Sequence, residues 1–395
     1  MKKIIILFLL ITCISTTIFA TEQNDSILTE NILEQDSEVI VVNARVIEAG
    51  EVYNQQMGDI NTKMQEVKVK VTQGEFKGQV FDTSYILSYD MENKILAYEL
   101  DKGNTVSLQI HKTGEQITQT IVQDVVRQNY IIYMIITFFA LIMIVGRKQG
   151  LKAIVGLIVT VVAIFTIMLN LIYKGYSPIL VSVLTSAIII IITFIIIAGI
   201  NKKSFTAAIG TTGGVLCSGI MAFIFGVVAK LSGGAEEAIY LSMTSQDIVF
   251  NFRELLFAGI VIASLGACMD VGMSIASALD ELKQKNPDMT WKELFTSGMN
   301  IGGDVIGTMT NTLILAYVGG ALNLILLFMA SDMSILDIIN KEMIATDAVS
   351  AIAGSMGVIF TVPITAFIYG IFNKDKTKYK TKSDNIIEGK RSLKI

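Results

Sequence analysis

Seven long apolar runs in the second two-thirds of the chain limit what it can fold into. They lie at 129–146, 152–173, 178–200, 204–229, 254–277, 307–330 and 347–372. Each approaches or exceeds the roughly 20 residues that a helix needs to cross the hydrocarbon core of a bilayer. Only 17% of the residues are charged, whereas soluble domains average about 25%. We therefore predict an α-helical polytopic membrane protein with about seven transmembrane helices in a membrane domain at 129–372.

The first 20 residues have the pattern of a secretory signal peptide. Lys2 and Lys3 precede an apolar stretch, and Ala20 ends a cleavage site in which Ile18 is larger than the preferred small residue. An uncleaved membrane anchor is the alternative. A lipoprotein signal at Cys13 is disfavoured because no small residue precedes the cysteine. Residues 21–38 are polar and acidic, which predicts a flexible lead-in.

Residues 39–116 change to short runs rich in β-branched side chains. Val67, Val69 and Val71 alternate with charged residues, which is the period of a half-buried strand. Several such runs in a short stretch predict a small β-barrel of the OB or SH3-like kind. No motif in it indicates a ligand, so a structural role is expected, and a ligand-binding role stays open. Residues 117–128 form a connector to the first span.

The basic residues of the loops predict the orientation of the spans. If the β-rich domain lies outside, the cytoplasmic segments hold roughly 16 Lys and Arg and the outer loops roughly 4, which satisfies the positive-inside rule. The tail at 373–395 is basic and falls on the cytoplasmic side in this arrangement. The signal peptide independently predicts the same orientation.

Charge and rare residue types exclude several functions. The net charge of −4 argues against a nucleic-acid partner, because such domains carry a basic face. The chain has a single histidine, His111, and it lies outside the spans. This argues against a His-based metal site and against a Ser-His or Cys-His nucleophile. The chain has no phosphate loop. We expect no enzyme activity, no metal and no cofactor.

An aspartate in the fifth apolar run lies on a polar helical face. Asp270, Ser274 and Ser277 are spaced four and three residues apart, so they share one face, and Gly266 lies beside it. Small residues on one face let helix backbones approach closely. A charge inside a membrane helix is costly, so Asp270 is a candidate functional residue. A hydrogen bond to neighbouring helix groups is the alternative role.

Residues just before and at the start of the sixth run repeat the pattern. Asp304, Thr308 and Asn311 again share one face. Glycines that allow close contact or a broken helix start surround the aspartate at Gly302, Gly303 and Gly307. The oxygen atoms of both faces suit a hard cation or a proton. Capping of a helix that begins near Gly307 is the alternative role of Asp304.

The seventh run contains Pro363, which predicts a hinge or a simple change of helix shape.

Six stretches of the sequence, taken in chain order, resemble the YibE/F family of bacterial multi-pass membrane proteins. They are QGEFKGQ, DVVRQNY, GRKQGLKA, GACMDVGMSIASAL, SGMNIGGDVIGTMTNTLILAYVGG and SMGVIFTVPITA. Gly303 departs from the basic residue expected before the aspartate. The resemblance implies an extracytoplasmic domain and about seven spans in the bacterial plasma membrane, and it implies no known reaction.

Three functions remain open. A transporter or permease would use Asp270 and Asp304 to bind a proton, a cation or a small solute. An assembly protein would use the β-rich domain to recruit an envelope partner. An intramembrane aspartyl protease is disfavoured, because Met269 precedes the first aspartate and the proline motif is Val362-Pro363-Ile364. The expected partners are the lipid bilayer, a solute or ion, and a second copy or an envelope protein.

Overall fold

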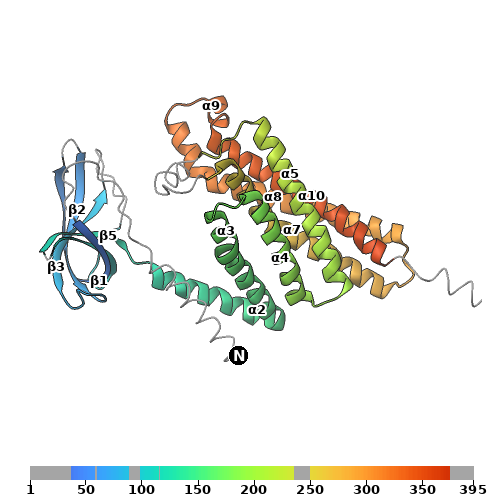
Figure 1. Cartoon of the computed structure of the whole chain (residues 1–395), viewed down its shortest axis with the longest axis horizontal. Coiled ribbons are helices and arrows are strands. Elements are labelled where there is room, and N and C mark those ends of the chain that lie inside the picture. The colour runs from blue at the N-terminus through green and yellow to red at the C-terminus, as the bar shows by residue number, and fades with distance from the viewer. Residues whose placement is uncertain (1–36, 58–59, 89–97, 115, 235–249, 374–395) are drawn as a thin grey trace, which may run out of the picture. The chain divides into compact units, whose positions relative to one another are not determined.

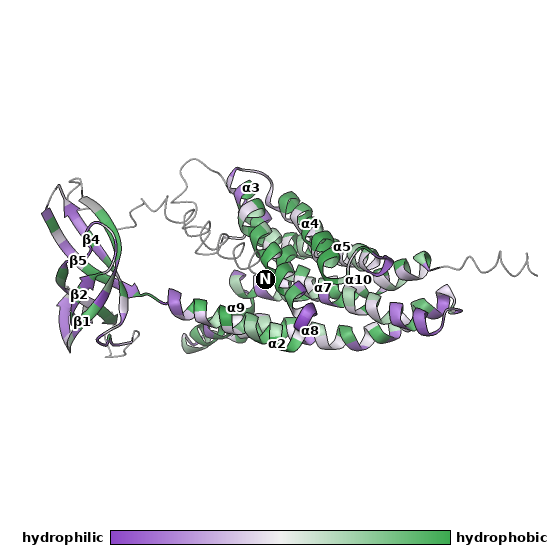
Figure 2. Cartoon of the chain, turned by 90° about the horizontal axis from the view of Figure 1, so that it is seen from below, coloured by the Kyte–Doolittle hydropathy of each residue, from purple (hydrophilic) through white to green (hydrophobic). Residues whose placement is uncertain are grey.

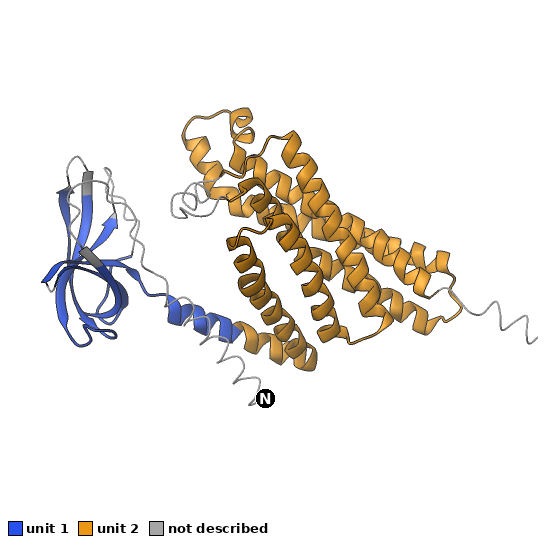
Figure 3. Ribbon diagram, viewed as in Figure 1, with its two compact units in different colours: residues 1–137 blue, residues 138–395 orange. Residues whose placement is uncertain are grey.

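The computed structural model describes residues 37–57, 60–88, 98–114, 116–234 and 250–373. The expected signal peptide and most of the acidic lead-in and basic tail lie outside these residues. The chain divides into two compact units, Met1–Thr137 and Phe138–Ile395, which are shown in Figure 3.

The first unit is a closed five-stranded barrel (Figure 1). Its strands are β1 (Ser37–Met57), β2 (Ile60–Val71), β3 (Val80–Ser88), β4 (Thr105–Thr113) and β5 (Gln116–Val125). They pair in the order β1-β2-β3-β5-β4, and only the β3–β5 pair is parallel. This closed barrel agrees with the predicted class of small barrel.

Alternation of side chains builds the barrel core. Val67, Val69 and Val71 point inward and are buried, whereas Glu66 and Lys70 are exposed. Two polar side chains of β2, Thr62 and Gln65, are also buried, and Gln65 bonds both backbone groups of Leu100. Its Nε2 donates to the Leu100 carbonyl at 3.1 Å, and its Oε1 accepts from the Leu100 amide at 2.8 Å. These bonds fix the segment before β4 to the barrel, because a buried polar group is costly without partners.

The second unit is helical, and hydrophobic residues run along most of α4 and α5 (Figure 2). Its long helices are α2 (Gln128–Val162, which begins in the first unit), α4 (Pro178–Ala198), α5 (Lys202–Val228), α7 (Phe252–Lys285), α8 (Trp291–Ala330) and α10 (Glu342–Phe372). Shorter pieces are the π-helix η1 (Ala163–Met168), α3 (Leu169–Tyr173) and α9 (Ile335–Ile339). The main core lies where α10 packs against α5, α7 and α8.

The described residues contain six helices long and apolar enough to cross a membrane, whereas we expected seven spans. The first, Gln128–Tyr173, is 46 residues long and contains both of the first two expected spans. Arg147 interrupts it with a non-helical backbone (φ 48°, ψ −125°). The break separates 128–146 from 148–173, and each part approaches or exceeds the length of a span. The fold is therefore the predicted polytopic helical protein with an N-terminal barrel.

Candidate functional site

The predicted polar face of α7 lies on the outer surface of the helical unit. Asp270 and Ser274 are exposed, and Ser277 is half-buried. Gly266 is exposed on the same face, and a side chain added there would meet no atom within 4 Å. The opposite face of α7 is buried against α4, α5 and α10. The polar face of α7 is therefore not covered by α4, α5 or α10.

The predicted face of α8 is exposed in the same way. Asp304, Thr308 and Asn311 are all exposed. A side chain added at Gly303 or Gly307 would also meet no atom within 4 Å. Only 6% of the most apolar window of α8 is buried, compared with 56% for α10. The helix thus presents both its lipid-compatible and its polar residues to the outside of the unit.

Both aspartates lie at a similar depth along their helices. No charged residue separates Asp270 from Asp280 or Asp304 from Glu293. At 1.5 Å per residue these intervals are about 15 Å and 16 Å of helix. The hydrocarbon core is about 30 Å thick. If Asp280 and Glu293, on the loop side of α7 and α8, mark one membrane surface, the two carboxylates lie at a similar depth, about 15 Å inside it.

The carboxylates of Asp270 and Asp304 do not contact a hydrogen-bonding or charged partner among the described residues. Within the described part of the chain, neither the Asp270 nor the Asp304 carboxylate makes a hydrogen bond or an ion pair. The hydroxyl of Thr308 donates to backbone carbonyls of α8, 3.3 Å from the oxygen of Asp304 and 3.1 Å from that of Val305. The described residues also hold no group of three His, Cys, Asp or Glu that could bind a metal ion. The two faces can offer carboxylate, hydroxyl and amide oxygens to a proton or a monovalent cation.

The alternative role of Asp304 as a helix cap is excluded. α8 begins at Trp291, where Thr290 accepts from the amide of Glu293 at 3.3 Å and the Glu293 side chain accepts from the amide of Thr290 at 2.7 Å. This capping box starts the helix about 20 Å before Asp304 at 1.5 Å per residue. The helix also continues without a break through the glycines near Gly307.

The predicted packing residues divide into two groups. Gly302 is buried, and a side chain there would lie 2.0 Å from Cγ1 of Val362 on α10. Gly302 therefore allows the close approach of α8 to α10 beside Pro363, which lies inside the continuous helix α10. Gly266, Gly303 and Gly307 instead have open space and make no such contact.

Several buried hydroxyl groups on α4 and α5 escaped the sequence interpretation. The hydroxyls of Ser186, Thr193, Thr206 and Ser218 are buried and have no hydrogen-bond partner among the described atoms. Thr211 on α5 donates to the backbone carbonyl of Cys268 on α7 at 3.2 Å. Small hydroxyl residues often mediate contacts between membrane helices, so packing accounts for them. The only sequence signal for these groups was the occurrence of Ser and Thr within the apolar runs.

Two further carboxylates were also missed. Asp280 on α7 accepts hydrogen bonds from the hydroxyl of Tyr369 at 3.0 Å and from Nε2 of Gln284 at 2.9 Å. Asp347 on α10 is half-buried and lies near Tyr317 on α8. Asp280 and Asp347 both lie near a helix end. In the sequence, a polar residue at such a position looks like the boundary of an apolar run and not like part of a site.

Comparison with curated proteins and with solved structures finds no match. The model of the family described as YibE/F-like protein matches residues 134–375, which contain the faces of α7 and α8. Because this match covers more than half of the chain, the protein belongs to the YibE/F family.

Proposed function

We propose that this multi-pass membrane protein is a transporter or permease. Its path for a proton, a cation or a small solute runs along the polar faces of α7 and α8. The observation that carries the proposal is the pair of exposed carboxylates on successive helices: Asp270 lies ten residues before Asp280, and Asp304 lies eleven residues after Glu293. Transporters commonly bind substrate and coupling ion near the bilayer midplane.

The cost of a charge in lipid supports this proposal. A charged side chain at the centre of a bilayer costs several kcal/mol, so intramembrane carboxylates face water or protein rather than acyl chains. On α8 the face around Asp304 also carries Thr308 and Asn311, whose oxygens are ligands for hard cations. Open space at Gly303 and Gly307 leaves room beside the carboxylate for a solute or its water.

The test is flux into proteoliposomes that contain the purified protein. We expect proton or cation flux from the wild-type chain, and its loss in Asp270→Asn, which removes the charge and keeps the shape. Asp288→Asn is the matched control, because Asp288 is an exposed carboxylate in the loop between α7 and α8. Equal flux from all three proteins would refute the role of Asp270.

Assembly with a partner is a second candidate function, and the barrel favours it. The barrel has its own hydrophobic core, separate from that of the helices, and its outer surface carries a groove. Deleting residues 37–125 discriminates the two functions. An assembly protein would lose its function, whereas a transporter would keep flux that depends on Asp270.

A further inference from the structure

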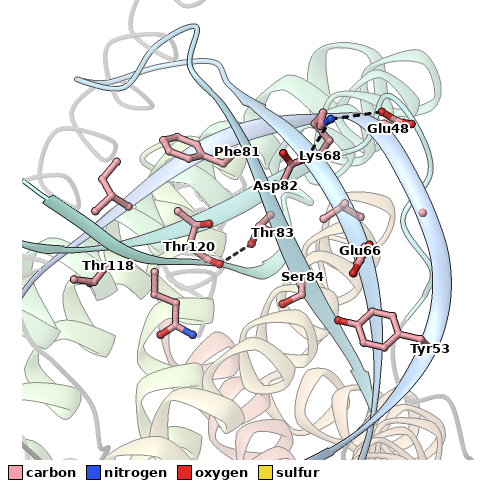
Figure 4. Close-up of a pocket in the computed structure, with 14 residues that line it drawn as sticks. Glu48, Tyr53, Glu66, Lys68, Phe81, Asp82, Thr83, Ser84, Thr118 and Thr120 are labelled. Atoms are coloured by element: carbon pink, nitrogen blue, oxygen red, sulfur yellow. Dashed lines mark hydrogen bonds and ion pairs between the residues drawn. The ribbon is translucent and has the colours of Figure 1, made fainter.

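The barrel carries a groove that the transport proposal does not use. Its volume is about 860 Å³, which lies within the roughly 300–1,000 Å³ of ligand-binding pockets. The groove is lined by residues of β1, β2, β3 and β5, and Figure 4 shows the side chains. Their chemistry is mixed: carboxylates, hydroxyls and the rings of Tyr53 and Phe81.

Irregularities in β1 shape one wall of the groove. The register between β1 and β2 shifts between Val46 and Glu48 and again between Ala49 and Val52. Such bulges bend a strand and increase its twist. Gly50 lies in the second shift, where an added side chain would meet the backbone oxygen of Glu66 at 2.9 Å. The glycine therefore lets β1 bend closely against β2 where both line the groove.

A gap between β3 and β5 forms the other side. The parallel pairing of these strands is limited to Ser84 with Ile121 and Tyr85 with Val122. Next to these pairs, the Thr83 hydroxyl donates a hydrogen bond to the carbonyl of Thr120 at 2.7 Å. Beyond it, residues 80–82 of β3 and 117–119 of β5 face each other without backbone pairing, so on this side neither segment is paired with a described strand. A free strand edge can hydrogen-bond an added extended segment.

The charges of the groove select the kind of ligand. Lys68 lies 3.3 Å from Asp82 and 4.0 Å from Glu48, so its charge is already matched by two carboxylates. Glu66 stands opposite Ser84 in the β2–β3 ladder and has no ion pair among the described residues. Three carboxylates against one lysine repel phosphate groups, which excludes nucleic acids and anionic headgroups. The unmatched charge favours a cation.

We propose that this groove binds an extended, basic peptide segment of a partner protein. The segment adds to the free edge of β3 or β5 through backbone hydrogen bonds, and one of its Lys or Arg side chains pairs with Glu66. The hydroxyls of Thr83, Ser84 and Thr118 lie along the same groove (Figure 4) and accept or donate to its polar side chains. This site is independent of Asp270 and Asp304, which lie in the other unit.

Fluorescence anisotropy with the full-length protein in phosphatidylcholine nanodiscs tests the proposal. The probe is a fluorescein-labelled hexapeptide of alternating Lys and Thr. We expect saturable binding that Glu66→Lys weakens about five- to tenfold, and that the shape-preserving Glu66→Gln weakens about two- to threefold. Glu99→Lys is the matched control, because Glu99 is exposed in the barrel outside the groove. It should change the affinity less than twofold.

Two further probes separate strand addition from charge attraction and from a sugar site. The same peptide with methyl groups on alternate backbone nitrogens should bind at least fivefold more weakly, because it cannot complete the hydrogen bonds of an added strand. Equal losses in Glu66→Lys and Glu99→Lys would overturn the proposal, because the attraction would then be non-specific. Saturable binding of neutral chitotriose without binding of the peptide would overturn it as well.

Discussion

At the residue scale, Asp124 and Arg127 form an ion pair where the last barrel strand, β5, leads into the first helix, α2. The Asp124 carboxylate accepts from the Arg127 guanidinium at 2.6 Å and from the amide of Val125 at 2.7 Å. The hydrogen bond from Arg127 lowers the pKa of Asp124 below its usual value of 3.8. A carboxylate with a lowered folded-state pKa stabilises the fold above its unfolded-state pKa, and this contribution disappears as the pH falls through the folded-state value.

We therefore predict a small, acid-sensitive contribution to the stability of β5. Asp124→Asn should reduce hydrogen-exchange protection of the β5 amides by about two- to fivefold at pH 7, because the pair is largely exposed to solvent. The difference between wild type and variant should shrink as the pH falls below 3.8 and vanish once the pH lies below the folded-state pKa of Asp124. The exposed carboxylate of Asp101 supplies the control variant, Asp101→Asn. A difference that persists in acid would show that the charge of Asp124 is not its cause.

Residue spacing in the sequence predicted which polar side chains share a helical face. The three- and four-residue spacings of Asp270 with Ser274 and of Asp304 with Thr308 follow from helix geometry alone. The exposure of these faces did not follow, because it depends on which side of α7 and α8 contacts α10. The buried hydroxyl of Thr206 was missed for the same reason: only the packed bundle shows which small polar groups are inside.

At the element scale, two adjacent glycines of α8 have opposite environments. A methyl group at Gly302 would overlap Val362 of α10, whereas one at Gly303 meets open space. Gly302→Ala should destabilise the protein by about 1–3 kcal/mol, as overpacked sites do. Gly303→Ala should leave the stability unchanged or raise it slightly, because alanine favours helix.

Thermal unfolding in detergent measures both variants. We expect the Tm of Gly302→Ala to fall by several degrees and that of Gly303→Ala to stay within about one degree of wild type or rise. Equal effects of the two substitutions would contradict the described packing of α8 on α10.

Element boundaries were harder to predict than element types. The barrel continues through β5 to Val125, whereas we expected it to end at residue 116, with a connector at 117–128. β5 is rich in Gln and Thr, and its one fully buried side chain is Val122. α8 starts at Trp291 rather than at 307, because the polar residues that precede the apolar run continue the helix. The Thr290-x-x-Glu293 capping box was a local signal for this start.

At the scale of the whole molecule, the chain combines a helical unit typical of its family with a separate barrel. The family match begins at residue 134, after the last strand of the barrel. The candidate transport faces and the candidate peptide groove thus lie in different units. Each can be altered without touching the residues of the other, so flux and peptide binding test two independent proposals.

The central claim is that the polar faces of α7 and α8 contact water inside the membrane. Cysteine labelling tests it most directly, because a thiol reacts with a water-soluble maleimide only where water reaches it. We would replace the three native cysteines by alanine and introduce Ser274→Cys or Thr308→Cys. Ile188→Cys is the control, since Ile188 is an exposed apolar residue in the middle of α4.

We predict that the reagent labels the Ser274→Cys and Thr308→Cys proteins in intact proteoliposomes and leaves the Ile188→Cys protein unlabelled. Labelling of the α7 and α8 variants no faster than that of the Ile188→Cys control would contradict the account. The two faces would then lie in lipid or in a dry protein contact, and no path for a solute would run along them.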